Sequence, residues 1–118
     1  MSAAEVFSIS ARTVNDARLL VLSGELDLAG AQTLTRAVAD ADAMSAVVAL
    51  DMRGVSFMDS SGLRGLLQAQ NRLRAAGSRL LLVQAPKSVL RVLQLTGTDA
   101  RFELVDSVGG TRTGGPSD

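Results

Sequence analysis

The amino-acid sequence predicts a single α/β domain built on a small mixed β-sheet of four to five strands. Apolar runs of strand length alternate with helical patterns, which is typical of sheets that contain parallel strands. The length of 118 residues suits one domain. Each helical pattern is apolar on one side only, so we expect the helices to cover the sheet mainly on one face.

The chain begins with a pattern that predicts a β-hairpin. Residues 6–13 alternate between apolar and polar side chains, and residues 18–25 are more continuously apolar. Asn15 and Asp16 lie between the two runs and favour a turn. We therefore expect the first two strands to pair with each other.

A helix and a third strand are predicted next. Asp27 is a good N-cap for a helix over residues 28–42. Its apolar residues at helical spacing are Leu28, Leu34, Val38 and Ala41. Residues 46–52 form an apolar run of strand length, and residues 53–54 interrupt it before a second short run over 55–58.

The second half of the chain predicts two more helices and two more strands. In order, these are a helix from Ser61 to Gly77, a strand over 78–85, a helix from Pro86 to Gly97 and a strand over 101–106. Glycine just past a helix end and proline at a helix start are typical of such boundaries. Residues 107–118 have too little apolar content to pack, so we expect a disordered tail after a domain over residues 5–106.

The composition excludes several classes of function. Twelve basic residues balance twelve acidic ones, whereas nucleic-acid binders usually carry a basic excess. The sequence has no Cys and no His, which removes thiol nucleophiles, imidazole bases and nearly all zinc sites. We expect no enzyme, no metal and no cofactor. The first residues do not resemble a signal peptide and no apolar run could span a bilayer, so we expect a cytoplasmic protein without membrane contact.

The sequence F-M-D-S-S-G-L at 57–63 carries the candidate site. One interpretation is capping, in which Asp59 or Ser60 accepts hydrogen bonds from free N–H groups at the start of the next helix. Gly62 is harder to explain in this way, because glycine in a helix costs roughly 0.5–1 kcal/mol relative to alanine. Such a glycine could let another molecule approach the backbone closely.

The second interpretation is a phosphorylation site that also contacts a partner. A hydroxyl at a helix start lies where the dipole and free amides accept a phosphate well. The added charge of about −1.5 to −2 would lie beside Asp59, and Asp27 opens a helix that could lie on the same edge. Charge repulsion of about 1–3 kcal/mol would then weaken an interaction. The residues alone leave open whether Ser60 or Ser61 is modified.

The order of the elements, with G-E-L-D at 24–27 and F-M-D-S-S-G-L at 57–63, resembles bacterial anti-sigma-factor antagonists of the STAS domain family. The resemblance covers roughly residues 5–106. It implies a non-catalytic regulator that, when unphosphorylated, binds an anti-sigma factor and thereby frees the sigma factor. It further implies that this anti-sigma factor is also a serine kinase of the histidine-kinase-like ATPase fold, and that a serine phosphatase reverses the modification.

The resemblance also implies roles for particular residues. The phosphoacceptor would be Ser60, with Ser61 as the second choice. The partner-binding residues would be Asp27, Met58, Asp59, Ser61, Gly62, Leu63 and Arg64. We expect Gly62 to keep this surface flat, so that Gly62→Val weakens partner binding while the fold stays intact.

Two points stay open in the sequence. Many family members have Gly where this chain has Arg64, which could pair with a phosphate, contact an acidic partner or be a solvated helix residue. The same fold also serves as an accessory subunit of lipid-transport ATPases, which are short single domains as well. The D-S-S-G sequence favours the phosphorylation switch.

Overall fold

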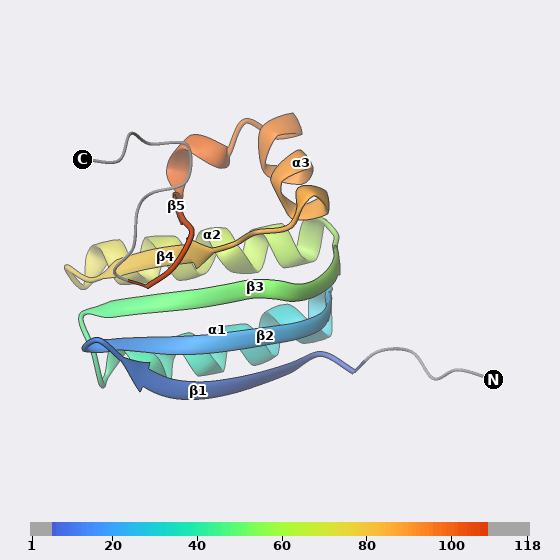
Figure 1. Cartoon of the computed structure of the whole chain (residues 1–118). Coiled ribbons are helices and arrows are strands. Elements are labelled where there is room, and N and C mark those ends of the chain that lie inside the picture. Colours follow the sequence, from blue (N-terminus) through green and yellow to red (C-terminus); the bar gives the residue numbers. More distant parts are fainter. Residues whose placement is uncertain (1–5, 109–118) are drawn as a thin grey trace.

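The computed structural model describes residues 6–108, which form one mixed sheet with helices on one face (Figure 1). The elements in chain order are β1 (Ser8–Val14), β2 (Ala17–Leu26), α1 (Leu28–Asp42), β3 (Val47–Met58), α2 (Ser60–Ala75), β4 (Arg79–Val83), α3 (Lys87–Leu95), a short 3₁₀ helix (Asp99–Arg101) and β5 (Glu103–Val105). The predicted α/β class, mixed sheet and strand number are confirmed.

The five strands lie in the sheet in the same order as in the sequence. β1 is antiparallel to β2, and all other neighbours are parallel. The predicted hairpin turn is present: Asn15 and Asp16 have φ values of 51° and 66°, as a type I′ turn requires. Because β2 to β5 are parallel, each connection crosses from the carboxyl end of one strand to the amino end of the next. The helices therefore all start at the carboxyl ends of the strands.

β3 is one continuous strand of 12 residues, so the interruption expected at residues 53–54 is wrong. Its pairing with β2 shifts register between Val21 and Ser23 and again between Gly24 and Glu25. At each shift β3 holds one residue more than β2 does. β3 therefore accommodates residues 53–54 through a β-bulge and continues past them.

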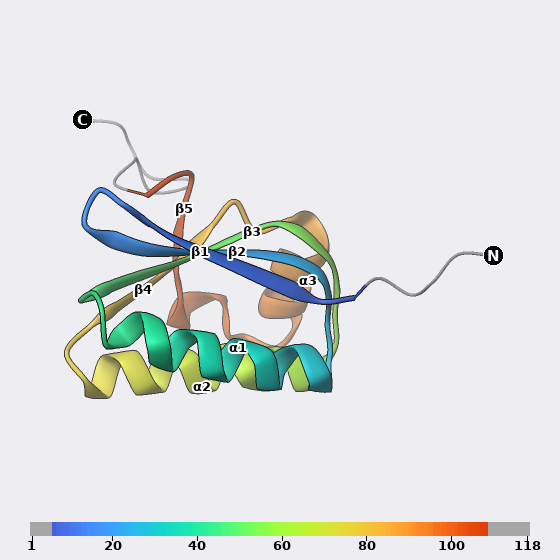
Figure 2. The ribbon, with the colours of Figure 1, turned by 90° about the horizontal axis from the view of Figure 1, so that it is seen from below.

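The main core lies between the sheet and the three helices, as the one-sided helical patterns predict. Figure 2 shows α1 and α2 side by side beneath the sheet. Fully buried side chains come from β2 to β4 and from every helix, and include Leu22, Leu34, Leu50, Leu66, Leu82 and Leu93. Gly65 lets α1 and α2 approach closely, because a Cβ there would lie 2.8 Å from the Cβ of Ala31.

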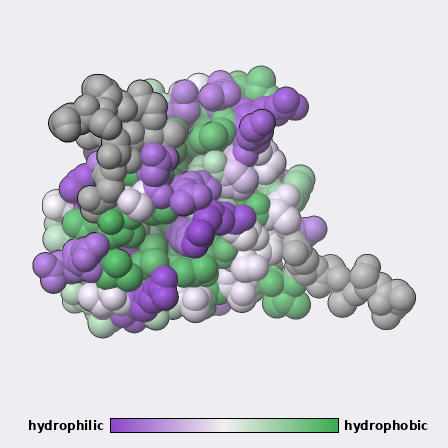
Figure 3. All heavy atoms as spheres, viewed as in Figure 1, coloured by the Kyte–Doolittle hydropathy of each residue, from purple (hydrophilic) through white to green (hydrophobic). Residues whose placement is uncertain are grey.

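A second, smaller cluster covers the opposite face of the sheet, seen in Figure 3 as hydrophobic patches among hydrophilic side chains. It consists of Leu19, Ala49, Leu81, Val83 and Val105, with Val108 packed against it. Val108, which the sequence analysis assigned to the tail, thus contacts the sheet. Gly109–Asp118, the rest of the predicted tail, lie outside the described residues.

Among the described residues, Asp51 is the one charged residue that is buried. It lies on the same face of β3 as Ala49. Arg53 donates to both carboxylate oxygens, at 3.1 Å from Nε and 2.9 Å from an Nη. Burial raises the pKa of Asp51, but hydrogen bonds from the Arg53 side chain and backbone, with the charges of Arg53 and Arg12, hold it below the ordinary value.

Candidate functional site

The start of α2 presents two serines whose hydroxyls take no part in capping. Asp59 is the N-cap, and its side chain accepts a hydrogen bond from the Gly62 N–H at 3.0 Å. The helix begins at Ser60, one residue earlier than expected. Ser60 is exposed and Ser61 is half-buried, and within residues 6–108 neither hydroxyl has a hydrogen-bond partner. Of the two capping candidates in the sequence, Asp59 and Ser60, only Asp59 caps the helix.

The start of α1 lies directly beside it. Asp27 is the N-cap of α1 and accepts from the Gly30 N–H at 3.0 Å, as predicted. Leu26 and Met58 are register partners at the ends of β2 and β3. The Asp59 N–H also donates to the carbonyl of Leu26, at 3.4 Å. Two capping carboxylates thus flank the serines at one edge of the sheet.

Gly62 has a packing role, and the expectation that it keeps an exposed surface flat is wrong. The residue is buried, and a Cβ added to it would lie 2.0 Å from the carbonyl oxygen of Leu26. That oxygen belongs to the backbone and cannot move aside easily. Gly62→Val is therefore expected to disturb the fold, contrary to the sequence-based expectation.

Two further residues of the predicted contact surface are buried. Met58 is 4% exposed and Leu63 is 9% exposed, so their side chains point into the core instead of toward a partner. Met58 ends the buried side of β3, and Leu63 begins the buried stripe of α2. Their place in the motif is explained by packing.

Two apolar residues that the sequence reasoning missed are exposed near the serines. Leu28, the first residue of α1, is 60% exposed, and Phe57, two residues before Asp59, is 49% exposed. The sequence analysis placed Leu28 in the apolar stripe of α1, but Leu28 is the first residue of the helix and lies just before the buried residues begin. Phe57 follows a register shift of β3, and no sequence signal predicted that shift.

Arg64 adds a positive charge beside the serines. It lies four residues after Ser60, so the two side chains share one face of α2, one turn apart. Arg64 is exposed and has no ion pair within the described residues. It is free to contact a phosphate or an acidic group of a partner.

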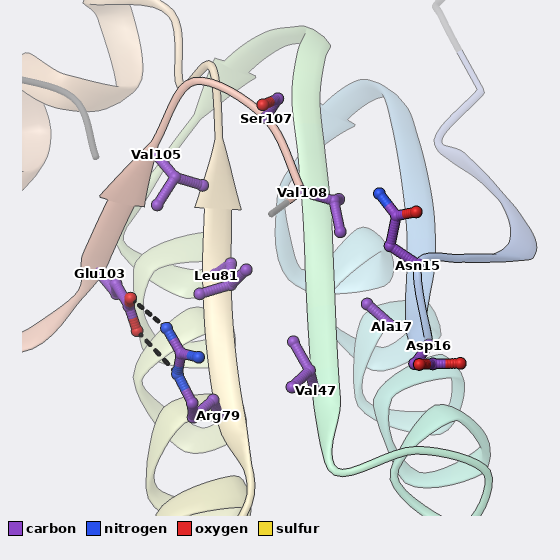
Figure 4. Close-up of a pocket in the computed structure, with 10 residues that line it drawn as sticks. All are labelled: Asn15, Asp16, Ala17, Val47, Arg79, Leu81, Glu103, Val105, Ser107 and Val108. Atoms are coloured by element: carbon purple, nitrogen blue, oxygen red, sulfur yellow. Dashed lines mark hydrogen bonds and ion pairs between the residues drawn. The ribbon is translucent and has the colours of Figure 1, made fainter. Parts of the chain in front are cut away.

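The pocket in Figure 4 lies at the opposite end of the sheet from the serines. It has a volume of about 390 Å³ and an apolar floor that includes Val47, Leu81 and Val105. An ion pair between Arg79 and Glu103 lies along one side. Its walls come mainly from the amino ends of β2 to β5 and from residues 105–108, whereas the helix starts lie at the carboxyl ends of β2 to β4. The pocket is separate from the serine site.

The chain is a small α/β domain in which α1, α2 and α3 cover one face of a mixed sheet. Two serines begin α2, the helix that Asp59 caps. A family model described as the STAS domain matches residues 8–110, which is most of the chain. The chain therefore belongs to the STAS domain family. Among residues 6–108, no helix is long and apolar enough to cross a membrane.

Solved structures with the same fold include anti-sigma factor antagonists. One from Mycobacterium paratuberculosis is 23% identical, with a TM-score of 0.74 over 92% of this chain and 93% of that one. The phosphorylated form of the Bacillus cell fate determinant SpoIIAA is 22% identical, with a TM-score of 0.64 over 85% and 91%. A sulfate transporter family protein from Wolinella succinogenes is 20% identical, with a TM-score of 0.67 over 77% of each chain. These similarities show a shared fold.

Proposed function

We propose that this protein is an anti-sigma factor antagonist that acts as a phosphorylation-controlled partner switch in the cytoplasm. Its unphosphorylated form would bind an anti-sigma factor that is also a serine kinase of the histidine-kinase-like ATPase fold, and so release the sigma factor. Phosphorylation of Ser60 would abolish binding, and a serine phosphatase would restore it. The observation that carries the proposal is the exposed Ser60 hydroxyl, left free because Asp59 already caps the helix.

Accessibility favours Ser60 over Ser61. Ser60 is exposed at the first position of α2, whereas Ser61 is half-buried. A kinase must bring its catalytic groups to the hydroxyl oxygen, and at Ser60 it could do so without opening the core. The phosphate would also lie at a helix N-terminus, where the dipole tolerates negative charge, so the fold should survive the modification.

The proposed docking surface surrounds Ser60 and combines apolar and charged groups. Leu28 and Phe57 supply exposed apolar area, which is the usual source of binding energy at an interface. Asp27, Asp59 and Arg64 supply charges around it. A phosphate would add about −1.5 to −2 charge beside the two carboxylates. Repulsion of about 1–3 kcal/mol corresponds to roughly 5- to 150-fold in affinity, enough to switch a partner off.

Intact-mass analysis tests the proposal. The protein would be incubated with ATP and with each candidate serine kinase of the same genome, beside the Ser60→Ala and Ser61→Ala variants. We expect one added phosphate that only Ser60→Ala abolishes, and capture of the same kinase by the unphosphorylated protein. Loss only in Ser61→Ala would move the site by one residue. No modification by any candidate would overturn the switch and favour the accessory subunit of a lipid-transport ATPase.

A further inference from the structure

β1 forms an open edge of the sheet. It is the outermost strand, and no other described element lies beyond it (Figure 1). Of its seven residues, five are exposed and two are half-buried. One side of β1 pairs with β2, so its outer side presents unpaired N–H and C=O groups to solvent. The opposite edge, β5, has only three residues and offers far less.

Natural proteins usually protect such an edge, and β1 has few of these protections. Prolines, bulges and inward-pointing charges are the common means. β1 contains no proline, and its register with β2 is regular from Ser8 to Val14. Arg12 is its one charged residue. The strand is therefore competent to pair with another strand along its full length.

A groove runs along this edge between β1 and α1. It has a volume of about 300 Å³, and its apolar lining includes Ile9, Ala11, Ala37 and Met44. Met44 is 63% exposed, so its side chain adds apolar area to this surface. The apolar surface thus continues from the edge strand onto the flank of α1.

The charges along the groove would be complementary to those of the same groove in a second copy. Arg36 and Asp40 both line it, one turn apart on α1, and both are exposed. Neither has an ion pair within residues 6–108. A two-fold axis would run the two α1 helices in opposite directions. Arg36 of each copy would then face Asp40 of the other. Within one copy the two side chains do not pair with each other, so both remain open to a partner.

The spacing of such a pair suits these side chains. Antiparallel pairing of two β1 strands would place the two β2 strands about 14 Å apart. α1 runs behind β2 in Figure 1, so the two α1 helices would be separated by a similar distance. Directly packed helices are roughly 8–10 Å apart, and the long side chains of Arg36 and Met44 would fill the difference.

We infer that a second copy of this chain binds antiparallel along β1 and joins the two sheets into one. A two-fold axis at Ala11 places Arg12 opposite Ser10, so like charges are not directly opposed. The two copies run in opposite directions, so their Ser60 sites lie at opposite ends of the joined sheet. Both sites remain accessible, and the inference stands independently of the proposed function.

Sedimentation equilibrium of the full chain, from micromolar to millimolar concentration, tests the inference. We expect a reversible dimer. Arg36→Asp and Asp40→Arg should each weaken it by roughly tenfold or more, because like charges would then face each other. The double variant with both exchanges should restore it, and Ala11→Lys should abolish it by placing a charge at the axis.

The controls distinguish the β1 interface from one formed elsewhere on the surface. Arg91→Asp changes an exposed charge on α3, remote from β1, and should leave the dimer unchanged. Thermal melts would establish that each variant is folded. A protein that is monomeric at every concentration would overturn the inference. A dimer that survives Ala11→Lys and both single charge reversals would also overturn it, because another surface must then form the interface.

Discussion

The starts of α1 and α2 are built alike and differ at the two residues that matter for function. In each, an aspartate N-cap accepts a hydrogen bond at 3.0 Å from a glycine three residues later. The residues between cap and glycine are Leu28 and Ala29 in α1, but Ser60 and Ser61 in α2. Since α1 is capped equally well without a hydroxyl, capping does not account for the serines of α2. The comparison shows that the serines are available for another role.

The two glycines should differ most in their tolerance of substitution. A Cβ at Gly62 would lie 2.0 Å from a backbone oxygen, whereas at Gly30 the close neighbours are a carbonyl at 3.0 Å and the Phe7 ring at 3.1 Å. We expect Gly62→Ala to lower the free energy of unfolding by about 3 kcal/mol, and Gly30→Ala by clearly less. Urea denaturation measures both. Equal losses would contradict the close approach of β2 and α2.

The exposed apolar residues should matter for binding but not for folding. Leu28→Ser removes apolar area beside Ser60, and we expect roughly tenfold weaker binding to the cognate anti-sigma factor. Because the side chain is 60% exposed, the unfolding free energy should change little. Calorimetric titration gives the affinity. Leu95→Ser makes the same change at an exposed position at the end of α3 and is the matched control. Equal binding by both variants would remove Leu28 from the docking surface.

The two caps should be energetically equivalent. Asp27→Ala and Asp59→Ala each remove one side-chain hydrogen bond to a helix N–H, and each should lower the unfolding free energy by about 1 kcal/mol. Ser60→Ala and Ser61→Ala should change it by less than about 0.5 kcal/mol, because neither hydroxyl is bonded. A Ser60→Ala loss as large as that of Asp59→Ala would show that the serine shares the capping role.

Acid should weaken the fold partly through Asp51. The pKa of Asp51 is lowered in the folded protein, so its contribution to stability is present above the unfolded value and is lost as pH falls through the folded value. Arg53→Met removes the main partner and should raise that pKa, so the variant should be less stable at neutral pH and should lose less stability through Asp51 as pH falls. Melting temperatures measured between neutral pH and about pH 3 test this. Identical acid profiles for the two proteins would contradict the role of Arg53 in lowering the pKa of Asp51.

Much of this architecture could be predicted from local sequence signals. Asn15 and Asp16 marked the hairpin, and Asp27 marked the start of α1, because both depend on neighbouring backbone groups. The role of Gly62 could not be found in this way. It depends on the carbonyl of Leu26, which is distant in sequence and approaches only after β2 and β3 have paired. The exposure of Phe57 likewise follows from a register shift between two strands.

The close packing of α1 on α2 at Gly65 and Ala31 has a consequence for recognition. Two helices in contact at this spacing move as one body, so Asp27 and Asp59 keep a fixed separation whether or not a partner is present. A partner would meet a surface that is already ordered, and little conformational entropy would be lost on association. The speed of any switch would then be governed by the addition and removal of charge, and not by a rearrangement of this domain.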